Sequence, residues 1–124
     1  MGQKVLNAQS DEPSLLSYAH CTPTNYTHYV SGSVTLLLIN LKDQPVETSL
    51  GAPSSSRSGL LYHFMSPDIL GQKLFVNGTE MKADSTGDFL FPLPQAIPVN
   101  QNLKIEGRSY LFVVFPDANA KACK

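Results

Sequence analysis

The side chains that could perform acid–base or metal chemistry are those of the acidic residues and histidines. The chain has ten acidic residues and three histidines. A retaining glycosidase needs two carboxyl groups about 5–5.5 Å apart. Most acidic residues here fall in expected turns; Asp84 and Asp88 flank one turn and are expected at a solvated surface. His20, His28 and His63 lack metal-ligand spacing, and no nucleophile elbow, Walker loop or dinucleotide fingerprint is present. The sequence therefore predicts no catalytic, metal or cofactor-binding residue in this chain.

Two cysteines and two Asn-X-Thr sequons carry the remaining chemistry. If Cys21 and Cys123 are bonded, they close a loop for which the chain-entropy model gives roughly 4–5 kcal/mol of stabilisation; two free buried thiols are the alternative. The sequons at 25–27 and 77–79 predict N-linked glycans on Asn25 and Asn77. Together these features favour a secreted chain. Because its start lacks a signal-peptide pattern, we expect a fragment of a longer protein.

The composition is that of one compact domain without a polyanion-binding surface. The chain has 124 residues, of which 42% are hydrophobic and 15% charged, with a formal net charge of -1. A domain that binds nucleic acid or a sulfated polysaccharide by itself is usually more basic, so such binding is not expected. The longest apolar stretch, 34–41, is strand-sized and much shorter than the roughly 18 residues of a membrane-spanning helix. No transmembrane segment is predicted.

Strand-like segments separated by Pro, Gly and Asn follow one another along the chain, and no window shows a helical period. The expected strands are residues 4–8, 15–20, 33–41, 45–50, 59–64, 73–76, 79–82, 103–105 and 109–115. Residues 45–50 are expected to pair with 33–41 as a hairpin, and Asn77-Gly78 to form the type I′ turn of another. The Pro-rich segment 91–98 suits an edge or a crossing loop. The predicted fold class is all-β, a single antiparallel β-sandwich of about eight short strands.

Several strings of this sequence resemble the C-terminal domain of heparanases, a family of glycoside hydrolases. They cover essentially the whole chain: MGQKVLNA, LLSYAHCT, VTLLLINL, KLFVNGTEMKA and SYLFVVFPDANAKAC. In that family a (β/α) barrel with two catalytic glutamates precedes a β-sandwich, which a strand from the far N-terminal part of the enzyme completes. The resemblance implies one disulfide, between Cys21 and Cys123. It also implies a barrel end or linker with a first short strand over residues 1–14, and the sandwich domain over 15–124.

The resemblance implies a non-catalytic role within a larger secreted enzyme. Both catalytic glutamates would lie upstream, in a parent endo-β-glucuronidase that cleaves heparan-sulfate-type polysaccharide without a cofactor. The implied partner is the catalytic barrel of the same parent, whose folding, secretion and activity this domain would support. A glycosaminoglycan would be contacted only through that parent, and no nucleic acid is expected. The implied location is extracellular or lysosomal, with membrane or matrix association left open.

Two other binding roles are compatible with a β-sandwich. A stand-alone carbohydrate-binding or adhesion module would stack exposed aromatics such as Tyr26, Tyr29 or Tyr62 on sugar rings. An immunoglobulin-like domain is disfavoured, because the chain has no Trp and its cysteines are too far apart for the usual inter-sheet bridge. Titration with glycans distinguishes the first alternative from the accessory role, which predicts weak or no binding.

Overall fold

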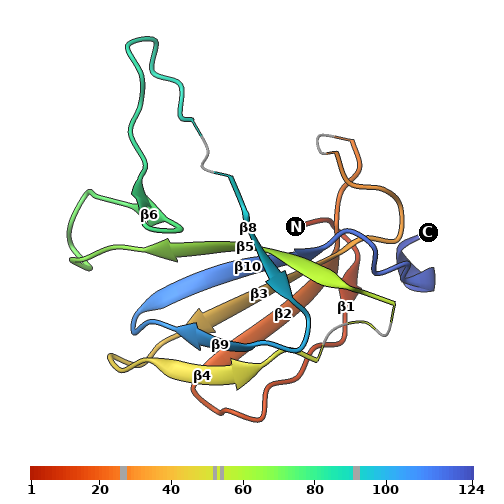
Figure 1. Cartoon of the computed structure of the whole chain (residues 1–124). Coiled ribbons are helices and arrows are strands. Elements are labelled where there is room, and N and C mark those ends of the chain that lie inside the picture. Colours follow the sequence, from red (N-terminus) through yellow and green to blue (C-terminus); the bar gives the residue numbers. More distant parts are fainter. Residues whose placement is uncertain (26–27, 52, 54, 91–92) are drawn as a thin grey trace.

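The regular secondary structure of the described residues is β-strand, with one short 3₁₀ turn (Figure 1). The computed structural model describes residues 1–25, 28–51, 53, 55–90 and 93–124. In chain order the elements are β1 (Val5–Leu6), β2 (Leu15–Cys21), β3 (Val34–Asn40), β4 (Val46–Ser49), β5 (Ser58–Met65), β6 (Phe75–Val76), β7 (Thr79–Glu80), β8 (Gln95–Pro98), β9 (Asn102–Ile105), β10 (Ser109–Phe115) and the turn η1 (Lys121–Cys123).

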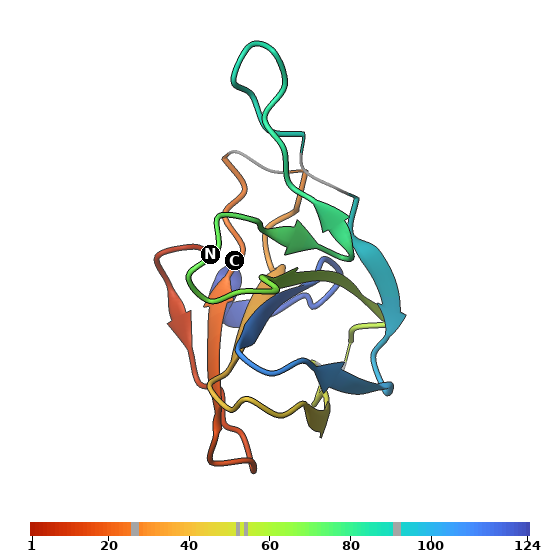
Figure 2. The ribbon, with the colours of Figure 1, turned by 90° about the vertical axis from the view of Figure 1, so that its left-hand side faces the viewer.

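The main sheet has eight antiparallel strands, with β3 and β10 near its centre. Its order is β1-β2-β3-β10-β5-β6-β7, and β8 pairs with the first half of β5. The strands β3 and β10 are near-continuous apolar runs, a pattern typical of strands that lie inside a sheet and are covered on both faces. Figure 2 shows that the sheet curves from β2 round to β5, so that it has a concave and a convex side.

The second sheet, formed by β4 and β9, lies over the concave side and closes the core (Figure 2). Ile105 of β9 and Val113 of β10 are 0% exposed. The core cluster draws on both sheets: Leu15, Val34, Leu38, Leu50, Leu61, Ile97, Leu103, Ile105, Leu111, Val113, Phe115 and Ala118. The predicted all-β antiparallel sandwich is therefore confirmed.

The expected hairpin between residues 33–41 and 45–50 is wrong, because β4 pairs with β9 in the other sheet. Both edges of β3 are already taken, by β2 and by β10, so β4 has no place beside it. The side chain of Asn40, 1% exposed, directs the crossing. Its Nδ2 donates to the carbonyls of Gln44 (2.9 Å), Ile105 (3.2 Å) and Glu106 (3.1 Å), which ties the turn after β3 to the end of β9.

The other strand predictions agree with the structure to within a few residues. The strand at 109–115 has the predicted bounds, and the segment 91–98 contains the edge strand β8. The turn between β6 and β7 has positive φ at Asn77 (49°) and Gly78 (80°), as the predicted type I′ turn requires.

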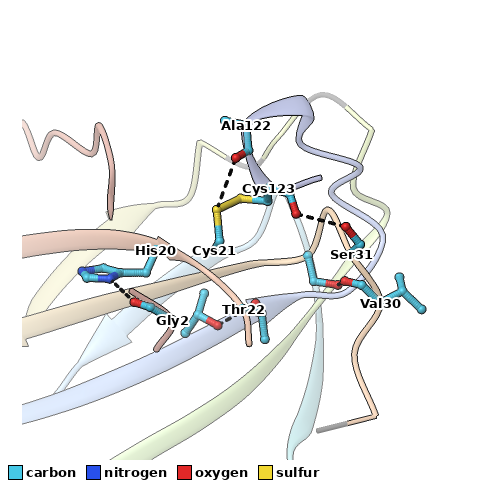
Figure 3. Close-up of a disulfide and its surroundings, with 10 residues drawn as sticks. Gly2, His20, Cys21, Thr22, Val30, Ser31, Ala122 and Cys123 are labelled. Carbon is cyan, nitrogen blue, oxygen red and sulfur yellow. Dashed lines mark hydrogen bonds between the residues drawn. A yellow bond between two sulfur atoms is a disulfide. The ribbon is translucent and has the colours of Figure 1, made fainter. Parts of the chain in front are cut away.

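The Cys21–Cys123 disulfide joins the end of β2 to the C-terminal turn (Figure 3). The two Cα atoms are 5.3 Å apart across a sequence separation of 102. The chain ends are also held by the backbone: Gly2 N donates to the Cys21 carbonyl (2.9 Å), and Gly32 N donates to the Cys123 carbonyl (3.1 Å). The bridge that the resemblance implied is present, and it closes the sandwich at one end.

Candidate interaction surfaces

The acidic pair Asp84 and Asp88 lies on an exposed arm, residues 81–90, that projects from the sandwich (Figure 1). The pair is held by its own turn: Asp84 Oδ1 accepts from Thr86 Oγ1 (2.6 Å), Thr86 N (2.8 Å) and Asp88 N (3.0 Å). These hydrogen bonds, led by that of the Thr86 hydroxyl, lower the pKa of Asp84. A glycosidase general acid needs the opposite shift; the carboxyl of Asp84 instead holds its own turn together.

The three histidines lie apart from one another, in different surroundings. His20 Nδ1 lies 2.7 Å from the Gly2 carbonyl (Figure 3), and His28 is exposed in a loop. His63 Nε2 lies 2.8 Å from Ser109 Oγ at the end of the core, where burial lowers the pKa of the imidazole. Among the described residues, no group of three or more His, Cys, Asp or Glu side chains is placed to hold a metal ion.

The convex side of the main sheet carries two adjacent cross-strand rows of apolar and aromatic side chains. The register places one row across β2, β3, β10 and β5 as Leu16, Ile39, Tyr110 and Phe64, and the next as Tyr18, Leu37, Phe112 and Tyr62. We call these eight residues the outer face. None of these residues carries a charge. In a sheet with one face in contact with water, the residues on that face are usually polar.

Three rings at the centre of the outer face pack against one another. Phe64 and Tyr110 are stacked, with ring centroids 5.0 Å apart and an interplanar angle of 7°. Phe112 meets both rings edge-on, at 5.7 and 6.0 Å. These are the favoured geometries of aromatic pairs, so the surface is preformed. Tyr110 remains 37% exposed and Tyr18 45% exposed.

Beside the outer face, the convex side has a third cross-strand row, which contains Thr35 and Val114. Unlike the outer face, this row is covered by the loop after β2. Thr35 and Val114 in this row are each 5% exposed, and Thr35 Oγ1 lies 2.8 Å from Thr22 Oγ1. The hydroxyls of Tyr29 and Tyr62 lie 3.2 Å apart, and burial followed by this contact raises the pKa of Tyr29. Two of the aromatics expected to stack on sugars are therefore engaged with each other, while Tyr26 lies outside the described residues.

A groove of about 600 Å³ opens on the concave side, between β4 and the segment that follows β1. Its floor is formed by inner residues of the main sheet such as Ala19, Leu36 and Leu38. Its walls are formed by residues 6–11 and 48–51. In the part of the chain that the structure describes, β4 pairs with β9 alone, so one edge of β4 offers free backbone groups.

The two predicted glycan acceptors lie in different environments. Asn25 is exposed in the loop after β2, and the other two residues of its sequon lie outside the described residues. Asn77 occupies the turn between β6 and β7 and is partly buried, with its side-chain amide hydrogen-bonded to the sheet. The strand pattern alone could not distinguish these two acceptors.

Of the outer face, the sequence reasoning singled out only Tyr62 as an exposed contact residue, although a signal for the others was present. An alternating strand buries one face only, whereas residues 34–41 and 109–115 are apolar at nearly every position. A run of that kind, in a domain too small to cover both sides of its sheet, indicates a second contact surface.

Comparison with known proteins finds a distant similarity in sequence that covers nearly the whole chain. No protein-family model matches the chain. The chain is 29% identical to heparanase of Rattus norvegicus over 129 aligned residues, which take in 99% of the chain. Among solved structures it is similar to a GH30 endoxylanase from Clostridium papyrosolvens C71, with a TM-score of 0.49 and 11% identity over 90% of the chain. It spans only 24% of the rat protein and 23% of the endoxylanase chain.

The disulfide and the likeness to heparanase point to a protein of the secreted, extracellular type. No helix in the described residues is long and apolar enough to cross a membrane. The sequence match runs from one end of the chain to the other, and the strings on which the resemblance was based lie within it. The chain is therefore a distant homologue of heparanase over nearly its whole length.

Proposed function

We propose that this chain is the C-terminal, non-catalytic β-sandwich of a heparanase-like endo-β-glucuronidase, docked through its outer face on the catalytic barrel of the same parent. The observation that carries the proposal is an uncharged aromatic sheet face on a chain that is similar to only 24% of a glycoside hydrolase. The parent would hydrolyse heparan-sulfate-type polysaccharide, and this domain would support the folding, secretion and activity of the barrel.

The energetics of the outer face support a permanent partner. Burying apolar surface contributes about 25 cal/mol per Å², and rings held in fixed orientations lose little further entropy when a partner covers them. The face offers hydroxyls only on Tyr18, Tyr62 and Tyr110, so few polar groups would need new hydrogen bonds in the interface. An interface made of apolar and aromatic side chains is more typical of an obligate contact than of a transient one.

The groove beside β4 supports a second contact with the same parent. The groove combines the free edge of β4 with an apolar floor. Such a site suits an extended segment that adds one strand to the smaller sheet. The resemblance implies that such a strand comes from the far N-terminal part of the enzyme. We place it here, between residues 6–11 and 48–51.

The domain limits and location follow from the same proposal. Residues 1–14 would form the linker from the barrel and residues 15–124 the sandwich. Within the linker, β1 already pairs with β2, through Val5 with His20 and Leu6 with Ala19. The linker would thus enter along one edge of the main sheet. The mature enzyme would act outside the cell or in the lysosome, at a membrane or in the matrix.

A domain exchange tests the proposal. This chain replaces the matched segment of rat heparanase, and the chimera is expressed in secreting cells. We expect a secreted, active chimera, because the outer face would meet the barrel. Charging the face with Tyr18→Asp and Tyr110→Asp should abolish both secretion and activity, whereas Leu41→Asp, at an exposed site in the turn before β4, should leave both unchanged.

Two results would contradict the accessory role. One is a chimera carrying Tyr18→Asp and Tyr110→Asp that is secreted and active like its parent chimera. The other is cleavage of heparan sulfate by the chain alone, since the proposal assigns catalysis to the barrel of the parent.

The carbohydrate-binding alternative is favoured by one observation, the exposed rings of Tyr18 and Tyr110 on a sheet face. Aromatic faces stack on sugar rings, but the aliphatic neighbours Leu16, Leu37 and Ile39 offer no hydrogen bonds to sugar hydroxyls. Calorimetric titration of the chain with heparan sulfate and with neutral glycans separates the two functions. Saturable binding that Tyr18→Ala abolishes would favour the binding module.

A further inference from the structure

The free edge of β5 contains a gap between two strand partners. β6 pairs with residues 64–65 of β5, and β8 pairs with residues 58–61. Between these ladders, the backbone N–H and C=O of His63 point to this edge, because successive residues of a strand direct these groups to alternate edges. Backbone groups that are partly buried need hydrogen-bond partners, and no strand of the described chain supplies them there.

The turn residue Asn77 fills this gap with its main chain and its side chain together. Its backbone N donates to the His63 carbonyl (2.9 Å), and its Oδ1 accepts from the His63 N–H (2.8 Å). Its Nδ2 donates to the carbonyls of Leu61 (2.9 Å) and Leu93 (3.3 Å). The carboxamide thus uses both donor hydrogens and its acceptor, and it stands in for a strand residue between β6 and β8.

We propose that Asn77 is a structural clamp and that the sequon at 77–79 carries no glycan in the folded, secreted chain. N-glycosylation joins the sugar C1 to Nδ2 and removes one of its two hydrogens, with a lipid pyrophosphate as the leaving group. Either the Leu61 or the Leu93 carbonyl would then lose its donor and face a sugar ring at hydrogen-bond distance. The bond to Leu61 is partly buried, so its loss is costly. The bond to Leu93 is exposed, so its loss costs less, but a sugar on that side would still displace the segment at Leu93 from Asn77. The glycan and the intact clamp are therefore expected to exclude each other.

This inference revises the expected glycan on Asn77 and does not depend on the proposed function. The chain offers a matched control, because Thr79 completes the sequon but is exposed. Thr79→Ala removes the sequon and leaves the clamp intact. Asn77→Asp removes the sequon and both donors while keeping the acceptor and a residue type that tolerates positive φ.

Secretion of the full chain from eukaryotic cells, followed by glycopeptide mass spectrometry and thermal unfolding, tests the clamp. We expect an unmodified Asn77 peptide, an unchanged Tm for Thr79→Ala, and a Tm lowered by about 4–10 °C for Asn77→Asp. In the unsubstituted chain the His63 amide should exchange slowly with deuterium, a readout that remains if Asn77→Asp fails to fold. A glycan on Asn77 of the folded, disulfide-bonded chain, a fast-exchanging His63 amide, or equal melting of Asn77→Asp and Thr79→Ala would overturn the proposal.

Discussion

The two faces of the main sheet are built from alternate residues of the same four strands, yet only one of them is covered. On the concave side Leu111 is 1% exposed and Val113 0%, beneath the sheet of β4 and β9. On the convex side their neighbour Tyr110 is 37% exposed. The difference does not lie in hydrophobicity, since both faces are apolar. The apolar residues of the main sheet are sufficient for an interface on each side. The described chain covers the concave side with β4 and β9 and leaves the outer face open.

The two faces also differ in how their polar groups are satisfied. The concave side contains buried Asn40 and Ser109, each hydrogen-bonded to backbone carbonyls at the end of β9. Such bonds specify one arrangement of the two sheets. The outer face instead presents rings packed on one another. A fixed internal interface and a preformed external one would suit the accessory role proposed above, because only the external one would have to form after the domain has folded.

The largest expected effect is on the end of the concave side, where the disulfide closes the sandwich. The double variant Cys21→Ala, Cys123→Ala should lose up to about 4–5 kcal/mol of the free energy of unfolding, because the unfolded chain regains the entropy of a long open loop. Urea unfolding measures this loss. Reducing the unsubstituted chain with dithiothreitol should produce the same loss, and a change below about 1 kcal/mol in both would show that the bridge is not what holds this end.

A leucine from each face tests the comparison directly. Leu111→Ala, on the concave side, should cost about 2–5 kcal/mol in the isolated chain, because it leaves a cavity in the closed core. Leu37→Ala, on the outer face, should cost about 1 kcal/mol or less, since its surroundings are still open to water. Urea unfolding of both variants gives the two values. Equal costs would mean that the outer face is not an open interface.

The smallest expected effect is a pH dependence that arises at the concave side. Burial lowers the pKa of His63, against the opposing pull of the Glu106 carboxylate. Since the unfolded state then binds the proton more readily, the stability that His63 contributes is complete above about pH 6.5 and declines as the pH falls below it.

His63→Gln provides the measurement, because Gln can still donate to Ser109 Oγ without titrating. We expect the urea midpoint of the unsubstituted chain to fall more between pH 7 and pH 5 than that of the variant. Parallel falls in the two proteins would place the pH dependence in groups other than His63.

Most strands could be predicted because local pattern and packing agree in them. Five of the seven residues in the run 109–115 are β-branched or aromatic, so the strand is strongly favoured there. The Asn77-Gly78 turn was predictable because positive φ at two successive positions demands those residue types. The partner of residues 45–50 was not predictable in this way. A hairpin with residues 33–41 is the short local choice, and only the strands on both sides of β3 exclude it.

The sequence by itself determined that this chain is an all-β sandwich, since strand periodicity is a local property. The tertiary structure decided which residues form the outer face, because alternation tells which residues share a side but not which side is covered. It also decided the role of Asn77. A sequon is recognised from three residues, whereas the carbonyls of Leu61 and Leu93 reach the amide of Asn77 only through folding, from sixteen positions away on either side.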